Sequence, residues 1–94
     1  MSDLRGEDIG HGVHVRFTGI YGQPDDIKGG IIVAHRHDDG QVCEGHVTFD
    51  VPENRDDRPK WAVESWEPLT ISPSVHNTGC GLHGFIREGK WVPA

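Results

Sequence analysis

The sequence lacks long apolar runs and lacks the helical spacing of apolar residues. No segment approaches the roughly 18 consecutive apolar residues that a membrane-spanning helix requires, so we expect no contact with a membrane. No window repeats apolar residues at helical intervals, so we expect no substantial helix. Residues 1–10 contain no apolar stretch of the kind that a signal peptide has. We therefore expect the protein to act in a cytoplasm, where thiols stay reduced.

Basic residues are also scarce. The chain has 9 Lys and Arg side chains against 15 Asp and Glu, which gives a net charge of −6. Proteins that bind nucleic acids usually present a basic face, because contacts to phosphates supply much of their affinity. The sequence contains no cluster of Lys or Arg. We therefore expect a protein partner and no nucleic acid.

The apolar content is low for a chain of this length. Only 34% of the 94 residues are hydrophobic, and 13 glycines and 6 prolines interrupt the chain. A domain this small buries a limited share of its surface, and small scaffolds often need a disulfide, a metal or a partner for stability. We expect one domain over residues 11–94, held by such a staple, with loosely ordered residues 1–10 before it.

What the chain does contain is a series of short segments in which apolar and polar residues alternate. Val13, Val15 and Phe17, for example, would share one face of a strand. Gly, Pro, Asp and Asn separate these segments. The sequence therefore predicts an all-β domain of about six short, mostly antiparallel strands, near residues 12–20, 29–37, 45–51, 60–66, 69–75 and 83–93. The last of these segments would form a hairpin around Glu88 and Gly89.

The two cysteines of the chain each stand three residues before a histidine, in "CEGH" at residues 43–46 and "CGLH" at residues 80–83. A structural zinc ion prefers four thiolate and imidazole ligands in a tetrahedron. Glycine in each spacer would allow a tight turn that brings a Cys and a His to one point. The spacing therefore predicts a structural Zn²⁺ site formed by Cys43, His46, Cys80 and His83. With four protein ligands, such a zinc would have no open position for chemistry.

Other arrangements of these residues stay open. His35, His37 or His76 could replace one ligand of the zinc site. A disulfide between the cysteines is disfavoured in a cytoplasm, although a reversible bridge would make a redox-active dithiol. A metal with three protein ligands and a bound water would instead support a small metal-dependent hydrolase or nuclease that uses the same three histidines.

Two serines, Ser72 and Ser74, lie in the stretch "TISPS". A serine nucleophile needs a base within hydrogen-bond reach and donors that stabilise the oxyanion. The sequence has no G-x-S-x-G elbow that would order these parts. We therefore expect both serines to have a structural role.

The C-terminal half resembles a family of small zinc-knuckle proteins that are encoded chiefly by actinobacteriophages. The family has bacterial relatives, some of which lie near genes for ubiquitin-like conjugation. The resemblance rests on "T-x-SPS" followed by C-x-x-H-GFI-x-x-G-x-W, and the matching residues are Trp61, Pro68, Thr70, Ser72, Pro73, Ser74, Cys80, His83, Gly84, Gly89 and Trp91. It implies a zinc-binding β module of phage origin without an established activity.

These observations lead to one expectation of function. We expect a non-enzymatic, zinc-binding protein of phage type that binds a host protein or is a minor virion component, in the host cytoplasm or in the virion. The alternation of its segment places Trp66 on the opposite face from Trp61, so we expect Trp66 to be an exposed partner contact. We expect Trp61 and Trp91 to pack in the core.

Overall fold

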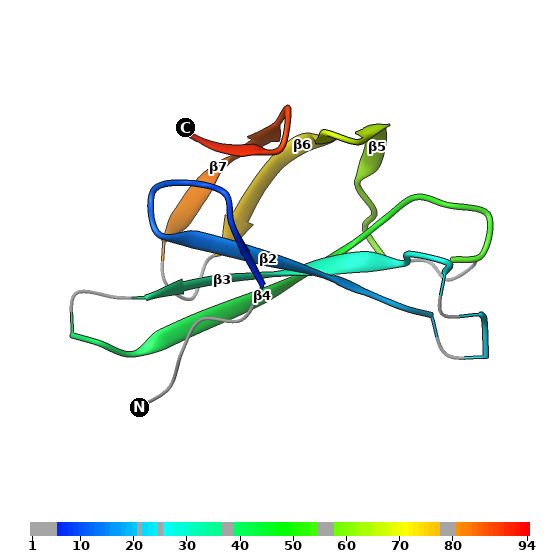
Figure 1. Ribbon diagram of the computed structural model, residues 1–94, viewed down its shortest axis with the longest axis horizontal. Coiled ribbons are helices and arrows are strands. Elements are labelled where there is room, and N and C mark those ends of the chain that lie inside the picture. The colour runs from blue at the N-terminus through cyan, green and yellow to red at the C-terminus, as the bar shows by residue number, and fades with distance from the viewer. Residues whose placement is uncertain (1–5, 21, 25, 37–38, 55–57, 78–80) are drawn as a thin grey trace.

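The computed structural model describes residues 6–20, 22–24, 26–36, 39–54, 58–77 and 81–94. These residues form two antiparallel sheets of four strands each, with the strand orders β1-β2-β3-β4 and β5-β6-β7-β8. In Figure 1 the first sheet lies below the second, and the chain passes between them after β4. Within each sheet, every strand pairs with its neighbours in sequence, so each sheet is a simple meander.

The strands are short. The first sheet contains β1 (Glu7–Asp8), β2 (Val13–Thr18), β3 (Gly30–Arg36) and β4 (Val42–Thr48). The second contains β5 (Ala62–Trp66), β6 (Leu69–Asn77), β7 (Leu82–Arg87) and β8 (Lys90–Pro93).

The all-β prediction is confirmed, and the described part of the chain contains no helix. It follows that none of the described residues belongs to a helix able to cross a membrane. The predicted number of about six strands is wrong, because the last predicted segment forms both β7 and β8 and the two-residue β1 adds another.

The core lies between the two sheets and follows from the period-two alternation of the strands. Trp91 is 4% exposed, and Trp61 packs partly buried against the core, as predicted. Trp66 is 47% exposed, which confirms its predicted position at the surface. The buried apolar side chains are Ile9, Val13, Val15, Ile31, Val33, Val47, Phe49, Leu69, Ile71, Val75, Ile86 and Trp91.

The passage from β4 to β5 is fixed by hydrogen bonds around Phe49. The Phe49 N–H donates to the carbonyl oxygen of Gly29 at 2.9 Å, and the N–H of Asp50 donates to the carbonyl oxygen of Trp61 at 2.8 Å. The side-chain amide of Asn54 donates to the carbonyl oxygens of Gly29 and Phe49, at 2.9 and 2.8 Å. These bonds fix the backbone of the segment that leads from β4 to Trp61, the residue before β5.

The β7–β8 hairpin forms where the sequence predicts it. Arg87 pairs with Lys90, and the two residues between them, Glu88 and Gly89, have φ values of 52° and 75°. Two positive φ values indicate a type I′ turn, whose twist matches that of the flanking strands.

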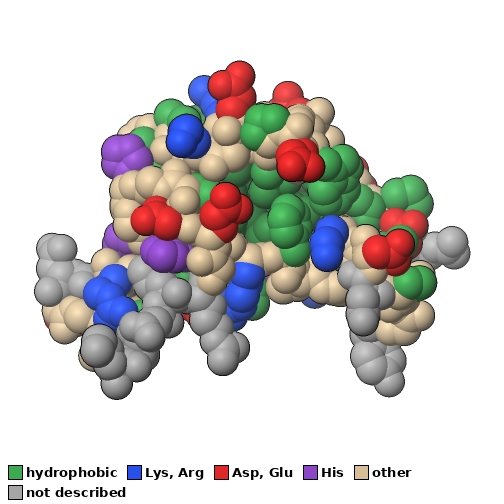
Figure 2. All heavy atoms as spheres, in the orientation of Figure 1, with side chains coloured by type: hydrophobic (Ala, Val, Ile, Leu, Met, Phe, Trp, Pro, Cys, Tyr) green, Lys and Arg blue, Asp and Glu red, His purple; other side chains and the backbone are tan. Residues whose placement is uncertain are grey.

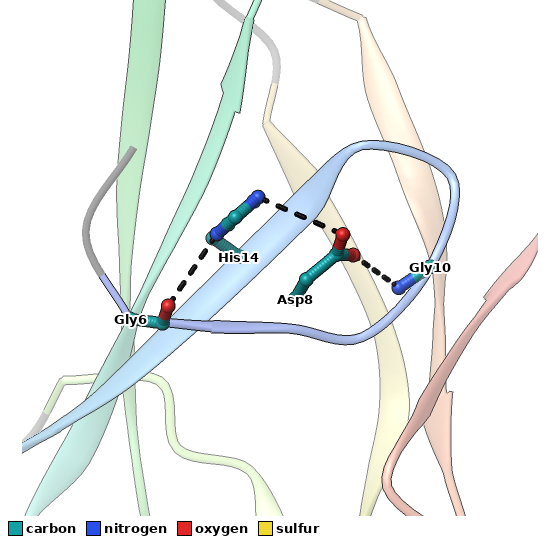
Figure 3. A network of polar contacts seen from close by, with 4 residues as sticks. All are labelled: Gly6, Asp8, Gly10 and His14. Carbon is teal, nitrogen blue, oxygen red and sulfur yellow. Dashed lines mark hydrogen bonds and ion pairs between the residues drawn. The ribbon is translucent and has the colours of Figure 1, made fainter. Parts of the chain in front are cut away.

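Asp8 and His14 hold the β1–β2 hairpin together (Figure 3). The Asp8 carboxylate accepts the N–H of Gly10 at 2.8 Å and lies 4.0 Å from Nε2 of His14. Nδ1 of the same ring lies 3.4 Å from the carbonyl oxygen of Gly6. No hydroxyl takes part in this network, so it supports the hairpin and offers no nucleophile.

The predicted loose N-terminus, residues 1–10, falls partly outside the described residues, because residues 1–5 are not among them. Of the remainder, Glu7 and Asp8 form β1, and Ile9 is 6% exposed. The carbonyl oxygen of Ile9 accepts the N–H of Trp91 at 2.8 Å, which joins the first hairpin to β8.

Candidate functional site

β4 runs without interruption through the first predicted zinc turn. Cys43 and His46 both lie in this strand, and every one of its residues pairs with β3. Side chains of a strand alternate between its two faces, so residues three apart point to opposite faces. The spacing that predicted a tight turn therefore separates the two side chains.

The two faces of β4 give Cys43 and His46 different neighbours. Val47 is buried in the core, so the adjacent His46 points outward, where its Nε2 lies 3.2 Å from the hydroxyl oxygen of Thr18. On the inner face, Cys43 stands opposite His35 in the register of β3 and β4. The reserve ligand His35 therefore shares a face with Cys43, and His46 does not.

Two of the other predicted ligands, Cys80 and the reserve ligand His37, lie outside the described residues. Within the described ranges, no three His, Cys, Asp or Glu side chains gather closely enough to hold a metal ion. The zinc site of Cys43, His46, Cys80 and His83 stays a prediction, and the register of β4 does not support its first half.

His83 lies beside a serine. Its Nε2 is 3.0 Å from Oγ of Ser74, and the two residues lie on the adjacent antiparallel strands β7 and β6. With the ring proton on Nδ1, Nε2 accepts a hydrogen bond from the serine hydroxyl. This is the contact that a general base makes with a serine nucleophile.

Strand alternation places this pair on the outer face of the second sheet. Val75 and Gly84, which are opposite each other in the register, are both buried, so their neighbours Ser74 and His83 point outward. His83 is exposed and Ser74 is half-buried. Figure 2 shows histidine side chains gathered at the left end of the molecule, apart from the apolar side chains at its centre and right. A pair on an open sheet face is accessible to a segment of another protein.

A β-bulge and an indole fix the backbone at Ser74. The register of β6 against β7 shifts between Ile71 and Val75, and Ser74 is the last residue before regular pairing resumes. Bulges of this kind occur next to active sites, where they re-aim a side chain. The indole Nε1–H of Trp61 donates to the carbonyl oxygen of Ser74 at 3.0 Å. This bond holds the end of the bulge.

A second imidazole stacks on His83. The rings of His76 and His83 have centroids 4.6 Å apart and planes 29° apart. The two residues are directly opposite in the register, and the carbonyl oxygen of His83 accepts the N–H of Ala94 on the β8 side. His76 and His83 are therefore a non-hydrogen-bonded pair, in which side chains approach most closely. This stacking restricts the rotation of the His83 ring.

The arrangement is a dyad rather than a triad within the part of the chain that the structure describes. There, no carboxylate forms a hydrogen bond or an ion pair with His83. Serine hydrolases need a nucleophile and a base in contact, and the orientation of the base can come from packing as well as from a carboxylate. The stacked His76 supplies that packing.

Comparison with known proteins gives one match. A family model described as "Bacterial ubiquitination-like system serine protease (BubE)" matches residues 25–94. No curated protein and no solved structure matches the chain. The matched segment includes the whole second sheet, and with it Ser74 and His83.

This match corrects three expectations from the sequence. A protease family contradicts the prediction of a non-enzymatic binding protein, and its serine chemistry also contradicts the alternative of a metal-dependent hydrolase or nuclease. The expected phage origin is wrong for a family described as bacterial. The part of the resemblance that pointed to ubiquitin-like conjugation in bacteria is confirmed.

Sequence reasoning named the two residues of the dyad but gave both of them other roles. Ser74 was expected to be structural because no nucleophile elbow precedes it, and His83 was expected to bind zinc. The available signal was the order of the segments. Ser74 and His83 lie on consecutive predicted strands, and consecutive antiparallel strands are adjacent. A serine and a histidine on such strands can meet without any local motif.

Proposed function

The chain belongs to the BubE family of serine proteases from bacterial ubiquitination-like systems, and we propose that Ser74 is its nucleophile and His83 its general base. The single observation that carries this assignment is the 3.0 Å contact between Oγ of Ser74 and Nε2 of His83. Among the side-chain hydrogen bonds of the described residues, this is the one that joins a serine to a histidine. It also lies in the segment that the family model matches.

The dyad supports the two half-reactions of a serine protease. Oγ of Ser74 attacks the carbonyl carbon of the scissile amide while Nε2 of His83 takes the hydroxyl proton. The imidazolium then gives this proton to the leaving amine, and the amide C–N bond breaks to leave an acyl-enzyme. Water, deprotonated by the same nitrogen, hydrolyses the ester and restores Ser74.

The substrate we propose is a protein of a bacterial ubiquitination-like system. The family description supports a protein substrate, and the exposed position of His83 on a sheet face is consistent with one. We therefore expect protein partners. The acidic composition, which disfavours nucleic acids, led to the same expectation.

The assignment is tested with a small fluorophosphonate, which reacts with activated serines and needs no peptide recognition. Peptide mass spectrometry of the labelled wild type should place the phosphonyl group on Ser74. Ser74→Ala should remove the label. Ser72→Ala is the matched control, because Ser72 lies in the same strand without a described histidine contact, and this variant should label like the wild type. A label on Ser72, or an unlabelled wild type, would contradict the proposal.

The structural zinc ion also stays a proposal, with two changes in its ligands: His35 takes the place of His46, and His83 is left to the dyad. Cys43 and His35 share the inner face of the first sheet in direct register, so they can approach one metal, whereas Cys43 and His46 cannot. Metal analysis of the purified protein, followed by chelation, tests this. A bound zinc should be stoichiometric, and its removal should lower the melting temperature strongly. An unchanged melting curve and absent metal would overturn it.

A further inference from the structure

The apolar core is left open at one end of β2. Along this strand the inward-facing side chains become steadily more exposed, from Val13 at 0% through Val15 at 7% to Phe17 at 45%. Strand alternation places Phe17 on the same inner face as the two valines, so the described strands of the second sheet do not cover it. Apolar surface of the inner face is therefore open to solvent here.

A β-bulge turns Trp66 toward the inner face of the second sheet. The register of β5 against β6 shifts between Val63 and Ser65, after which Trp66 stands directly opposite Leu69. Leu69 is buried in the core, so Trp66 shares its inward face although 47% of its surface is exposed. Bulges re-aim the side chains beside them, and this one brings a large aromatic ring to the open end of the core.

Phe49 joins the two exposed rings into one surface. Its own ring is fully buried and lies edge-to-face against both neighbours, at centroid distances of 6.4 Å to Phe17 and 5.4 Å to Trp66. Phe17 and Trp66 line a groove of about 510 Å³, and Trp66 also lines a second groove of about 320 Å³. Exposed apolar surfaces of this kind commonly mark sites of protein contact.

The described residues that line the two grooves include more carboxylates than cations. The carboxylates are Glu7, Asp26, Glu53, Glu67 and Glu88. The cations in the same lining are Lys28 and Lys90, and no ion pair among the described residues includes any of the five carboxylates. Figure 2 shows acidic side chains around the apolar area at the centre and right of the molecule. The grooves therefore have an excess of negative charge.

Lys28 illustrates the chemistry that these aromatic rings accept. Its ammonium nitrogen lies 5.8 Å from the centroid of the Phe17 ring, within the distance at which a ring attracts a cation. The indole of tryptophan attracts cations more strongly than phenylalanine does. Among the described residues no cation lies over Trp66. An Arg or Lys side chain from another protein can therefore lie against Trp66 with carboxylates nearby.

We propose that these grooves form a docking site for a basic segment of a partner protein, in which Arg or Lys side chains flank one apolar side chain. The apolar side chain covers Phe17 and Trp66, and the cations face the carboxylates. A second copy of this chain does not suit the site, because it would bring the same excess of carboxylates to the contact. Neither Ser74 nor His83 lines the grooves, so the inference does not depend on the dyad.

The test measures the binding of synthetic decapeptides of Gly and Ser to the full chain. The basic probe carries a central Arg-Leu-Arg, and two control probes carry Glu-Leu-Glu or Arg-Ser-Arg in its place. Ser74→Ala is the host, so that the probes stay intact. We expect the basic probe to shift the indole ¹⁵N–¹H signal of Trp66 saturably, with a Kd below about 1 mM. Both controls should bind at least about 10-fold more weakly.

Variants of the docking site separate its apolar and acidic parts. Trp66→Ala should weaken binding of a fluorescein-labelled basic probe about 10-fold, measured by fluorescence anisotropy. The double variant Glu67→Gln with Glu88→Gln keeps the aromatic rings and should weaken binding about 3- to 10-fold, as should added salt. Glu64→Gln is the matched control and should bind like the host, because Glu64 is exposed in the same strand as Trp66 but lines neither groove.

Three results would overturn the docking site. The first is no shift of the Trp66 signal with the basic probe, and the second is equal binding of the Glu-Leu-Glu probe. The third is a Trp66 signal that moves with protein concentration alone, since a second copy would then be the occupant. If Trp66→Ala does not fold, the Glu67 and Glu88 variant decides, and unchanged binding there contradicts the proposal. Labelling of Ser74 by the fluorophosphonate tests the dyad separately.

Discussion

Two histidines of this chain make nearly the same contact in different places. His46 lies 3.2 Å from the hydroxyl of Thr18 on the first sheet, and His83 lies 3.0 Å from the hydroxyl of Ser74 on the second. Both histidines follow a cysteine by three residues. The pairs differ in what surrounds them, and this difference teaches that a hydroxyl–imidazole contact alone does not make a catalytic site.

The surroundings favour the second pair on two counts. His83 has a stacked imidazole, His76, and Ser74 has its carbonyl held by Trp61. The described contacts of His46 and Thr18 include neither of these supports, and the pair lies on the outer face of the first sheet beside the ion pair of Arg16 and Glu44, whose charged atoms are 3.0 Å apart.

The largest expected effect comes from removing the base. His83→Gln should lower kcat and the rate of fluorophosphonate labelling by about 10²- to 10⁴-fold, the usual contribution of general base catalysis. His46→Gln is the matched control on the other sheet and should keep both rates within about twofold, because rates change only through groups that act in the transition state. Equal losses in the two variants would remove the distinction between the pairs.

A smaller effect is expected from the stacked ring. His76→Ala should lower kcat about 2- to 10-fold with little change in KM, because aromatic stacking contributes roughly 0.5–1.5 kcal/mol to the position of a ring. His76→Phe keeps a stacking surface and should recover most of the loss. Steady-state kinetics with a quenched-fluorescent peptide that the wild type cleaves measure this. If Phe fails to rescue, His76 does not act through stacking.

A modest loss of stability is expected at Trp61. Trp61→Phe keeps the aromatic packing and removes the indole N–H that donates to the carbonyl of Ser74. The free energy of unfolding should fall by about 1 kcal/mol, the usual net value of one hydrogen bond. Urea denaturation measures it. Trp66→Phe, at an exposed residue whose indole has no described hydrogen bond to β6, serves as control, and a larger loss there would contradict this account.

The smallest effect is expected at Thr18. Thr18→Ser gives the first sheet a serine–histidine pair like that of the second, and its unfolding free energy should change by less than about 0.5 kcal/mol, as is usual at surfaces. In the Ser74→Ala background this new serine should stay unlabelled by the fluorophosphonate. Labelling at position 18 would show that the contact alone is sufficient and that the surroundings of Ser74 matter little.

The sequence predicted the strands well because their signal is local. Alternation of apolar and polar residues is visible within five or six residues, so β2, β3, β5 and β6 were found near their true positions. β4 was the exception, since its first half contains "CEGH", and the cysteine–histidine spacing suggested a turn. Pairing with β3 across seven residues overrides that local pattern.

The site was harder to predict because its contacts are not local. His83 lies nine positions after Ser74, and Trp61, whose indole holds the Ser74 carbonyl, lies thirteen positions before it. Each of these residues has an ordinary structural use when taken alone. The expected zinc ligands and the proposed dyad share His83, so the sequence drew attention to this residue without indicating its contact with Ser74.

The amino-acid sequence by itself determined that this chain is an all-β domain with an acidic surface and a two-residue hairpin at Glu88 and Gly89, because alternation, composition and turn chemistry are properties of neighbouring residues. Only the tertiary structure decided which histidine lies against which hydroxyl group. The pleat sends Cys43 and His46 to opposite faces, and the antiparallel register brings His83 against Ser74. Those outcomes depend on strand pairing, which no short stretch of sequence contains.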